Sequence, residues 1–243
     1  MKDTAAIILA AGKGTRMKSH LPKPLVPVQG RPMVRYLIDA LESAGVKDIA
    51  VVIGHGAEEM RSELGNDYKL PFQEVRSGTA DAVACAASAV SDSKHVFVFV
   101  GDSPLLSAES VTKLHEAHVN EGAQCSFLTA HFDTLFPYAR VIRDPQGSVK
   151  ACIEERDCTE AQKEIRELLT SHFLFDTAHL FETLNRVPRH PTTEERYLTD
   201  VIGLTLEDGK RVSALSIGDW KELVGLNTPE DVEWAESYLR KDA

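Results

Sequence analysis

Short, unbroken apolar runs that end near glycine constrain the fold of this chain more than any other feature of its sequence. Three of them lie in the first half: Thr4–Leu9, Ile49–Ile53 and Val96–Val100. Runs of this length without polar alternation are typical of strands that are buried on both faces of a sheet. Helical patterns alternate with them, at Pro32–Ser43, Thr79–Ala89 and Ala108–Asn120. This alternation predicts right-handed βαβ units, and therefore an α/β fold whose mixed, mostly parallel central sheet has helices on both faces.

The pattern changes after about residue 123, where strand-like stretches follow one another with less helix between them. They are Cys125–His131, Arg140–Arg143, Val149–Ile153 and His172–Phe175. Such close spacing favours antiparallel pairing, so we predict a small antiparallel extension of the sheet. The remaining predicted elements are a short strand ending near Val75, a helix at Glu194–Leu206, a strand at Val212–Ile217 and a helix starting at Thr228.

The charge of the chain limits its partners. A formal net charge of -10 at pH 7 argues against nucleic acid or an anionic membrane as the main partner, and a phosphate-bearing substrate would need a local cluster of basic residues. No secretory signal precedes the first predicted strand, and no apolar run approaches the roughly 18 residues that span a bilayer. The four cysteines form no CxxC pair, which favours reduced thiols. We therefore expect a cytoplasmic protein.

The required basic cluster lies in the loop after the first predicted strand. It reads Leu9-Ala10-Ala11-Gly12-Lys13-Gly14-Thr15-Arg16-Met17 and is followed by Leu21-Pro22-Lys23-Pro24. Open α/β sheets bind ligands at the carboxyl ends of their strands, and small residues let backbone N–H groups approach phosphate oxygens. A dinucleotide fingerprint requires a third glycine near Met17, and a P-loop requires Lys-Ser/Thr after its last glycine, so neither fits. A plain glycine turn with solvated basic residues is the alternative interpretation of a bare Gly-x-Gly.

The whole string resembles the signature of the sugar-1-phosphate nucleotidyltransferases, and most of all that of the uridylyltransferase domains of N-acetylglucosamine-1-phosphate uridylyltransferases, also called UDP-N-acetylglucosamine pyrophosphorylases. The similarity runs along nearly the whole chain. It implies a Rossmann-like nucleotide-diphospho-sugar transferase fold in a single domain, residues 1–243. Within it, about 1–122 would be the nucleotide-binding half, about 123–227 the sugar-binding half and 228–243 a C-terminal helix. It also implies an enzyme that uses UTP, a sugar 1-phosphate and Mg²⁺.

The same resemblance implies roles for individual residues. Arg16, Lys23 and Asp102 match catalytic residues, the first two as cations that contact the phosphates. Asp102 and Asn227 match the two protein ligands of the metal ion, and Gln73, five residues before Gly78, matches the base-reading glutamine. The other nucleotide-binding positions implied are Leu9, Ala10, Ala11, Gly12, Gly14, Thr15, Gly78 and Thr79. The sugar-binding positions implied are Ala139, Glu154, Leu169, Tyr197 and Thr199.

Departures from the family pattern cluster at the sugar end. Glu-x-Asn-Thr-Gly of the family appears here as Glu167-Leu168-Leu169-Thr170-Ser171, and Gly-Tyr-Gly-Arg appears as Pro137-Tyr138-Ala139-Arg140. Ala80-Asp81-Ala82 stands where the uridylyltransferases that this chain resembles most have Gly-His-Ala, although other sugar nucleotidyltransferases carry the Ala-Asp-Ala form. Each lost polar contact to a substrate changes affinity by about 1–3 kcal/mol, which is the scale on which sugars are discriminated. The departures therefore bear on the acceptor and not on the nucleotide. N-acetylglucosamine 1-phosphate remains the leading acceptor that the resemblance implies, with glucose 1-phosphate or another phosphorylated sugar second, and dTTP remains open beside UTP.

Two functions from other classes stay open. A non-catalytic nucleotide or sugar-nucleotide binding protein would bind nucleotide without exchanging pyrophosphate. A dinucleotide-dependent oxidoreductase would need an acidic residue at the end of the second strand, where this chain has Gly54-His55-Gly56. Bifunctional members of the family continue into a hexapeptide-repeat domain that forms their trimer, whereas this sequence ends at Ala243. We expect a monomer or small homo-oligomer without that trimer, and small-molecule partners only.

Overall fold

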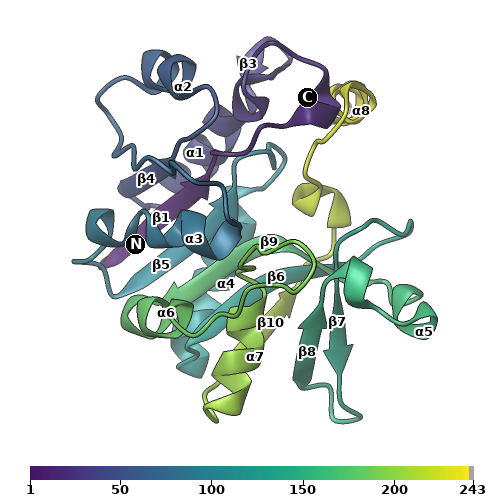
Figure 1. Cartoon of the computed structure of the whole chain (residues 1–243). Helices are drawn as coiled ribbons and strands as arrows, with labels where there is room; N and C mark the ends of the chain where they lie inside the picture. The colour runs from purple at the N-terminus through teal and green to yellow at the C-terminus, as the bar shows by residue number, and fades with distance from the viewer. Residues whose placement is uncertain (241–243) are drawn as a thin grey trace.

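One mixed sheet connects both halves of the chain in the computed structural model, which describes residues 1–240 (Figure 1). Its main strands run in the order β10-β6-β9-β5-β1-β4. Their bounds are Val212–Ser216, Cys125–His131, Glu167–Asp176, His95–Val100, Thr4–Leu9 and Asp48–Val52. β1 pairs in parallel with β4 and β5, and β10 with β6, whereas β9 is antiparallel to both of its neighbours. Five of these strands therefore point the same way, which confirms a mostly parallel sheet.

The antiparallel extension is also confirmed. β7 (Ala139–Arg143) pairs with β8 (Val149–Ile153), and its first residues pair with β9. In Figure 1 this hairpin projects from the sheet beside the short helix α5 (Glu160–Lys163). A separate two-stranded ribbon, β2 (Pro27–Val28) and β3 (Arg31–Pro32), lies near the C-terminal helix α8 (Pro229–Leu239). The predicted terminal helix 228–243 includes residues 241–243, which lie outside the described residues.

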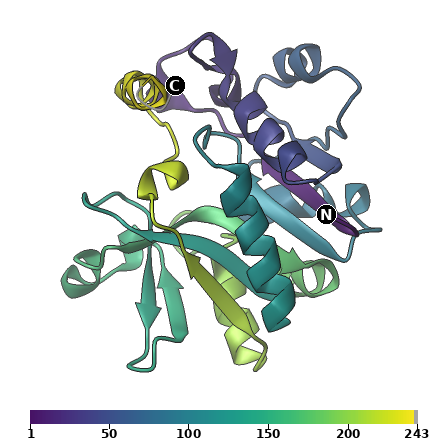
Figure 2. The ribbon, with the colours of Figure 1, turned by 180° about the vertical axis from the view of Figure 1, so that it is seen from behind.

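Each face of the sheet has its own apolar core, because successive side chains of a strand point to opposite faces. From β1, Ala6 and Ile8 join the core shared with α1 (Met33–Ser43) and α4 (Ala108–Glu121). These two helices lie in front of the sheet in Figure 2, where the molecule is seen from behind. Ala5 and Ile7 join the core on the opposite face. That core contains residues of α3 (Thr79–Ala84), α6 (Thr177–Leu184) and α7 (Asp200–Glu207).

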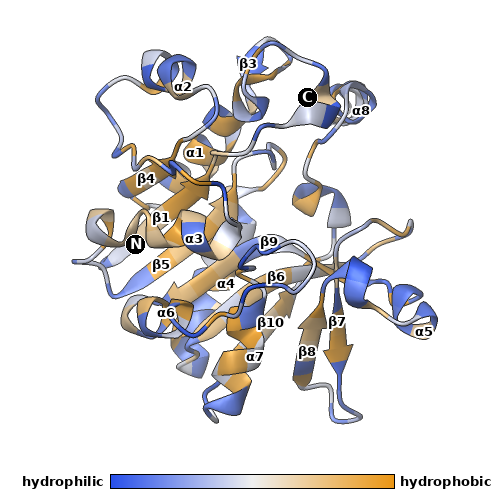
Figure 3. Cartoon of the chain, in the orientation of Figure 1, coloured by the Kyte–Doolittle hydropathy of each residue, from blue (hydrophilic) through white to orange (hydrophobic). Residues whose placement is uncertain are grey.

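The colouring by hydropathy follows this layering. Figure 3 shows the central strands as mainly hydrophobic and α5 as hydrophilic. Helix α2 (Ala57–Leu64), which the sequence analysis did not anticipate, buries only Met60 and Leu64. Among residues 1–240, no helix is both long and apolar enough to cross a membrane.

Four predicted elements were wrong in extent. The strand predicted at His172–Phe175 spans Glu167–Asp176. The stretch before Val75 makes only isolated bridges to the edge of β4, at Lys69 and Phe72, because Pro71 between them has no N–H to donate. The helix predicted at Thr79–Ala89 ends at Ala84 and is followed by a separate 3-10 turn at Ala87–Ala89. The helix predicted at Glu194–Leu206 begins only at Asp200.

The late start of α7 has a local and a long-range cause. Glu194 has a φ of 59°, which a right-handed helix does not allow. The backbone of Arg196 is also used elsewhere, since its N–H donates to Ser77 O at 2.8 Å and its C=O accepts from Ala80 N at 3.0 Å. Tertiary hydrogen bonds to the start of α3 therefore replace the helical ones.

Ser171 gives the first testable prediction. It lies within β9 with a φ of 66°, at a shift in the β6–β9 register, and it stands where the family pattern has glycine. A left-handed conformation costs a non-glycine residue roughly 1–2 kcal/mol, and glycine avoids it at an entropic cost of about 0.5–1 kcal/mol. We expect Ser171→Gly to raise the free energy of unfolding by up to about 1 kcal/mol in urea denaturation. Ser216→Gly, in a strand residue without positive φ, should lower it; a destabilised Ser171→Gly would contradict the assignment of strain.

Candidate active site

A cavity with a volume of about 580 Å³ lies at the carboxyl ends of β1 and β5. Fourteen of the residues assigned from the sequence line it. They are Leu9, Ala10, Ala11, Gly12, Gly14, Thr15, Arg16, Lys23, Gln73, Gly78, Thr79, Asp102, Tyr197 and Asn227. Glu195 and Tyr197 reach the cavity from the segment between α6 and α7, residues 187–199, and Asn227 reaches it from just before α8. Both halves of the predicted domain therefore contribute to one cavity.

The loop after β1 is held close to the sheet by its backbone. Ala10 N donates to Val52 O at 2.9 Å, and Ala11 O accepts from His55 N at 3.1 Å. Gly14 has a φ of 58°, and a Cβ there would lie 2.5 Å from Cβ of Lys23. Glycine at this position therefore lets the loop turn while the Lys23 stem packs against it. Beyond the turn, exposed Lys13 and Arg16 supply positive charge at the cavity.

Lys23 brings together the two residues assigned as metal ligands. Its ammonium donates to Asn227 Oδ1 at 2.8 Å and also contacts Asp102 Oδ2. Arg16 donates to the same oxygen of Asn227 at 2.8 Å. The Asn227 amide is oriented by its own Nδ2, which donates to Gly225 O at 2.7 Å, so that Oδ1 faces the cations. Three segments separated by more than 70 residues thus meet at one point.

The donor set at this point fits a divalent cation. Asp102 Oδ1 is buried without a hydrogen-bond partner, and the other carboxylate oxygen is already in contact with a cation, the Lys23 ammonium. Carboxylate and carboxamide oxygens are ligands that Mg²⁺ accepts, and Mg²⁺ commonly takes its remaining ligands from phosphates and water. Residues 1–240 contain no cluster of three His, Cys, Asp or Glu side chains suited to a metal ion. A site built from Asp102 and Asn227 would therefore depend on substrate oxygens.

Tyr138 holds the segment before Asn227 against Asp102. Its hydroxyl accepts a hydrogen bond from Gly225 N at 3.0 Å, and burial raises the pKa of this phenol. Leu226 N donates to Asp102 O at 2.9 Å. A Cβ on Gly225 would lie 3.1 Å from Asp102 Oδ1, so glycine allows the close approach.

On the side assigned to the base, Gln73 is buried and its backbone N–H donates to Ile53 O at 2.8 Å. Its side-chain Nε2 donates to Gly78 O at 3.3 Å. Gly78 has a φ of 116°, and a Cβ there would lie 2.2 Å from Arg196 O. This glycine therefore permits the 187–199 segment to lie directly on the start of α3.

The residues assigned to the sugar separate into two groups. Tyr197 lines the cavity, and its hydroxyl donates to Glu195 Oε2 at 2.8 Å and accepts from Arg156 at 3.0 Å. Thr199 and Glu154 do not line the cavity but bond to each other, at 2.7 Å. Ala139 and Leu169 also lie outside the lining: they are partners across β7 and β9 and are buried in the apolar core. The structure therefore does not bring Ala139, Glu154, Leu169 and Thr199 to the cavity that is lined by the loop after β1.

Seven lining residues were not assigned from the sequence: Lys13, Pro24, Arg76, Ala82, Val100, Gly101 and Glu195. Two of them, Arg76 and Glu195, are charged and lie outside the basic loop. Arg76 lies two residues before Gly78, and its charge next to the assigned Gly-Thr pair was a signal that could have found it. Glu195 had no such signal, because only the irregular path of the 187–199 segment brings it to the cavity.

Comparison with known proteins finds a family model and curated relatives that match most of this chain. A family model described as the MobA-like NTP transferase domain matches residues 6–185. Proteins named bifunctional protein GlmU are 38% identical over 242 residues in Brevibacillus brevis and 40% identical over 228 residues in Enterococcus faecalis. These alignments cover 99% and 93% of this chain but 52% and 50% of the relatives, so the chain spans about half the length of the curated relatives it matches.

A solved structure from Bacillus anthracis, described as a glucose-1-phosphate thymidylyltransferase in complex with a sucrose, superimposes with a TM-score of 0.81. The superposition covers 98% of this chain and 95% of that one at 18% sequence identity. This similarity confirms the predicted fold: a mixed α/β sheet of the Rossmann-like nucleotidyltransferase type.

Proposed function

The chain belongs to the MobA-like NTP transferase domain family, and on that premise we propose that it transfers a uridylyl group from UTP to a sugar 1-phosphate and releases pyrophosphate. The observation that carries the proposal is the meeting of Arg16, Lys23, Asp102 and Asn227 at one point of a cavity lined by small residues. Such a site can bind several phosphate groups in an otherwise acidic protein.

N-acetylglucosamine 1-phosphate is the leading acceptor in this proposal. It rests on the resemblance of the chain to the uridylyltransferases that act on this sugar, and the similarity to proteins named GlmU supports it. Thymidylyl or uridylyl transfer to glucose 1-phosphate is the alternative, which the name of the Bacillus anthracis structure supports. A non-catalytic nucleotide-binding protein is the second alternative, because Ala139 and Leu169 offer the sugar no polar side chain. A cytoplasmic location is part of the proposal.

The reaction needs no nucleophile from the protein. An oxygen of the sugar phosphate, already anionic at pH 7, bonds to the α-phosphorus as the bond from that phosphorus to the bridging oxygen breaks, and pyrophosphate leaves with the electron pair. Arg16 can bind phosphate oxygens through two N–H groups at once, and Lys23 adds a positive charge beside them. Fixed cations of this kind stabilise the charge that builds up on the departing group. The buried amide of Gln73 can pair with a pyrimidine base.

Asp102 and Asn227 would hold Mg²⁺ in this proposal. A bound Mg²⁺ supplies neutralisation of phosphate charge at this point of the cavity. The chain prepares the place by fixing Asn227 Oδ1 through Gly225 and by leaving Asp102 Oδ1 without a protein partner.

Pyrophosphate release across a panel of substrates tests the proposed function. The panel combines UTP and dTTP with N-acetylglucosamine 1-phosphate, glucose 1-phosphate and galactose 1-phosphate, with Mg²⁺ present. We expect the highest kcat/KM for UTP with N-acetylglucosamine 1-phosphate. A preference for glucose 1-phosphate would establish the alternative acceptor. Tight nucleotide binding without turnover of any pair would refute catalysis and favour the binding protein.

Loss of either charged group should reduce turnover of the preferred pair. We expect Arg16→Ala and Asp102→Ala each to lower kcat by about a hundredfold or more, the effect of removing one fixed electrostatic group at a reacting centre. Arg31 and Asp39 form an exposed ion pair and provide matched controls, since Arg31→Ala and Asp39→Ala make the same changes away from the cavity. Both controls should retain nearly full activity. Activity of Arg16→Ala and Asp102→Ala within about tenfold of wild type would contradict their assignment.

The position of the Lys23 ammonium leads to a prediction about metal binding in the absence of nucleotide. Its ammonium contacts Asn227 Oδ1 and the Asp102 carboxylate, the two side chains that would hold the ion, so its positive charge competes with the ion until phosphates draw it away. We expect Lys23→Met to bind Mn²⁺ at least about tenfold more tightly than wild type, because a like charge a few ångströms away costs on the order of 1–4 kcal/mol. The measurement is an electron paramagnetic resonance titration of free Mn²⁺ without nucleotide. Lys13→Met, on the same loop, is the control; equal affinities for wild type and Lys23→Met would show that Lys23 does not compete.

A further inference from the structure

The segment between α6 and α7, residues 187–199, is fixed to the start of α3 by its backbone. The Arg196 C=O accepts a hydrogen bond from Ala80 N, and its N–H donates to Ser77 O. Leu198 N donates to Thr79 Oγ1 at 2.9 Å. Gly78 makes this contact possible, because any Cβ there would collide with the Arg196 backbone. We call residues 187–199 the rim segment, since Glu195 and Tyr197 within it line the cavity.

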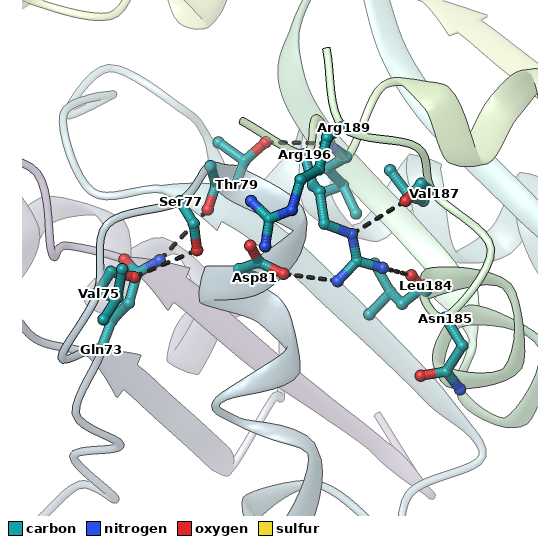
Figure 4. A network of polar contacts seen from close by, with 12 residues as sticks. Gln73, Val75, Ser77, Thr79, Asp81, Leu184, Asn185, Val187, Arg189 and Arg196 are labelled. Atoms are coloured by element: carbon teal, nitrogen blue, oxygen red, sulfur yellow. Dashed lines mark hydrogen bonds and ion pairs between the residues drawn. The ribbon is translucent and has the colours of Figure 1, made fainter. Parts of the chain in front are cut away.

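The side chain of Arg196 adds an ion pair to these backbone contacts. Its Nη1 donates to Asp81 Oδ1 at 2.6 Å, and both side chains are only 19% exposed. Its Nε donates to Val187 O at 3.0 Å, and its Nη2 donates to Leu184 O. Figure 4 shows the guanidinium between Asp81 on α3 and the two carbonyls near the end of α6. One planar group with several donors therefore ties three stretches of chain together.

The ion pair connects the segment that contains Glu195 and Tyr197 to helix α3, which begins at Thr79 just after Gly78. On the rim segment, Arg196 lies between Glu195 and Tyr197, and Thr199 of the same stretch donates to Glu154. On the other side, Asp81 follows Gly78 and Thr79, and the Gly78 carbonyl accepts from the assigned base-reading Gln73. The pair itself does not line the cavity, so it acts on bound substrate through its neighbours.

We propose that Asp81 and Arg196 are positioning residues for the acceptor: their ion pair holds Glu195 and Tyr197 where the sugar phosphate binds. This inference rests on the proposed function. It also gives a physical reason for Asp81, which stands where the uridylyltransferases that this chain resembles most have histidine: here the carboxylate pairs with Arg196 of the rim segment. The nucleotide-binding side of the cavity depends less on this ion pair, because Gln73 is held by a backbone hydrogen bond to Ile53 and by the hydrogen bond from its side chain to Gly78 O.

Steady-state kinetics of Asp81→Asn and Arg196→Met test the proposal. We expect each variant to raise KM for the sugar phosphate about fivefold or more while kcat stays within about threefold and nucleotide Kd within about twofold, since positioning is lost but the charged centre is not. The double variant should raise KM no more than the more affected single variant, because the two residues act as one unit. Asp208→Asn is the matched control: it removes the carboxylate from the nearby Arg186–Asp208 pair, and it should leave KM unchanged.

Hydrogen exchange provides a second readout that does not need the reaction. Peptides covering residues 187–199 should exchange about tenfold faster in Asp81→Asn than in wild type, while peptides from α1 and α4 should not change, because only the local opening becomes easier. Unchanged KM in both single variants, additive effects in the double variant, or unchanged exchange in the rim segment would each overturn the proposal. Wild-type protein that turns over no sugar phosphate would refute the proposed function instead, and the exchange measurement would still decide whether the pair holds the segment.

Discussion

The contact of the Lys23 ammonium with Asp102 and Asn227 is the interaction on which the candidate site depends. It joins the loop after β1, the end of β5 and the segment before α8, which no local structure would bring together. A partly buried carboxylate is stabilised by a nearby positive charge, and Lys23 supplies it to Asp102 from a stem that packs against Gly14. The same arrangement explains how a chain of net charge -10 presents a local site for anions.

The sheet makes this meeting possible because parallel strands end at the same edge. The loop follows β1, Asp102 follows β5, and Gln73 bonds to Ile53 just after β4. All three therefore lie at the same edge of the sheet. Two separate apolar cores hold the sheet from both faces, so that edge is set by extensive packing and not by the loops themselves. Glycine is then required where another part of the chain approaches closely, whether a side chain, as at Gly14 and Gly225, or a backbone, as at Gly78.

The departures from the family pattern acquire structural meaning at the sugar end. Leu169 and Ala139 face each other across two strands as an apolar pair, which places both in the core on the α3 side of the sheet. Ser171 keeps a left-handed backbone although it is not glycine. Asp81 finds its partner in Arg196. Packing, a left-handed backbone residue and an ion pair thus accommodate these residues in this chain.

The sequence by itself located the strands of the main sheet, five of the helices and the loop after β1, because unbroken apolar runs and glycine spacing are local signals. It also named fourteen of the residues that line the cavity, whose roles stay predictions. It did not predict the β2–β3 ribbon or the helices α2, α5 and α6. Only the tertiary structure decided that Glu194–Thr199 is not helical and that Arg76 and Glu195 belong to the cavity. There the hydrogen bonds of Arg196 with Ser77, Ala80 and Asp81 outweigh a local preference for helix, and partners more than a hundred residues away cannot be identified from spacing.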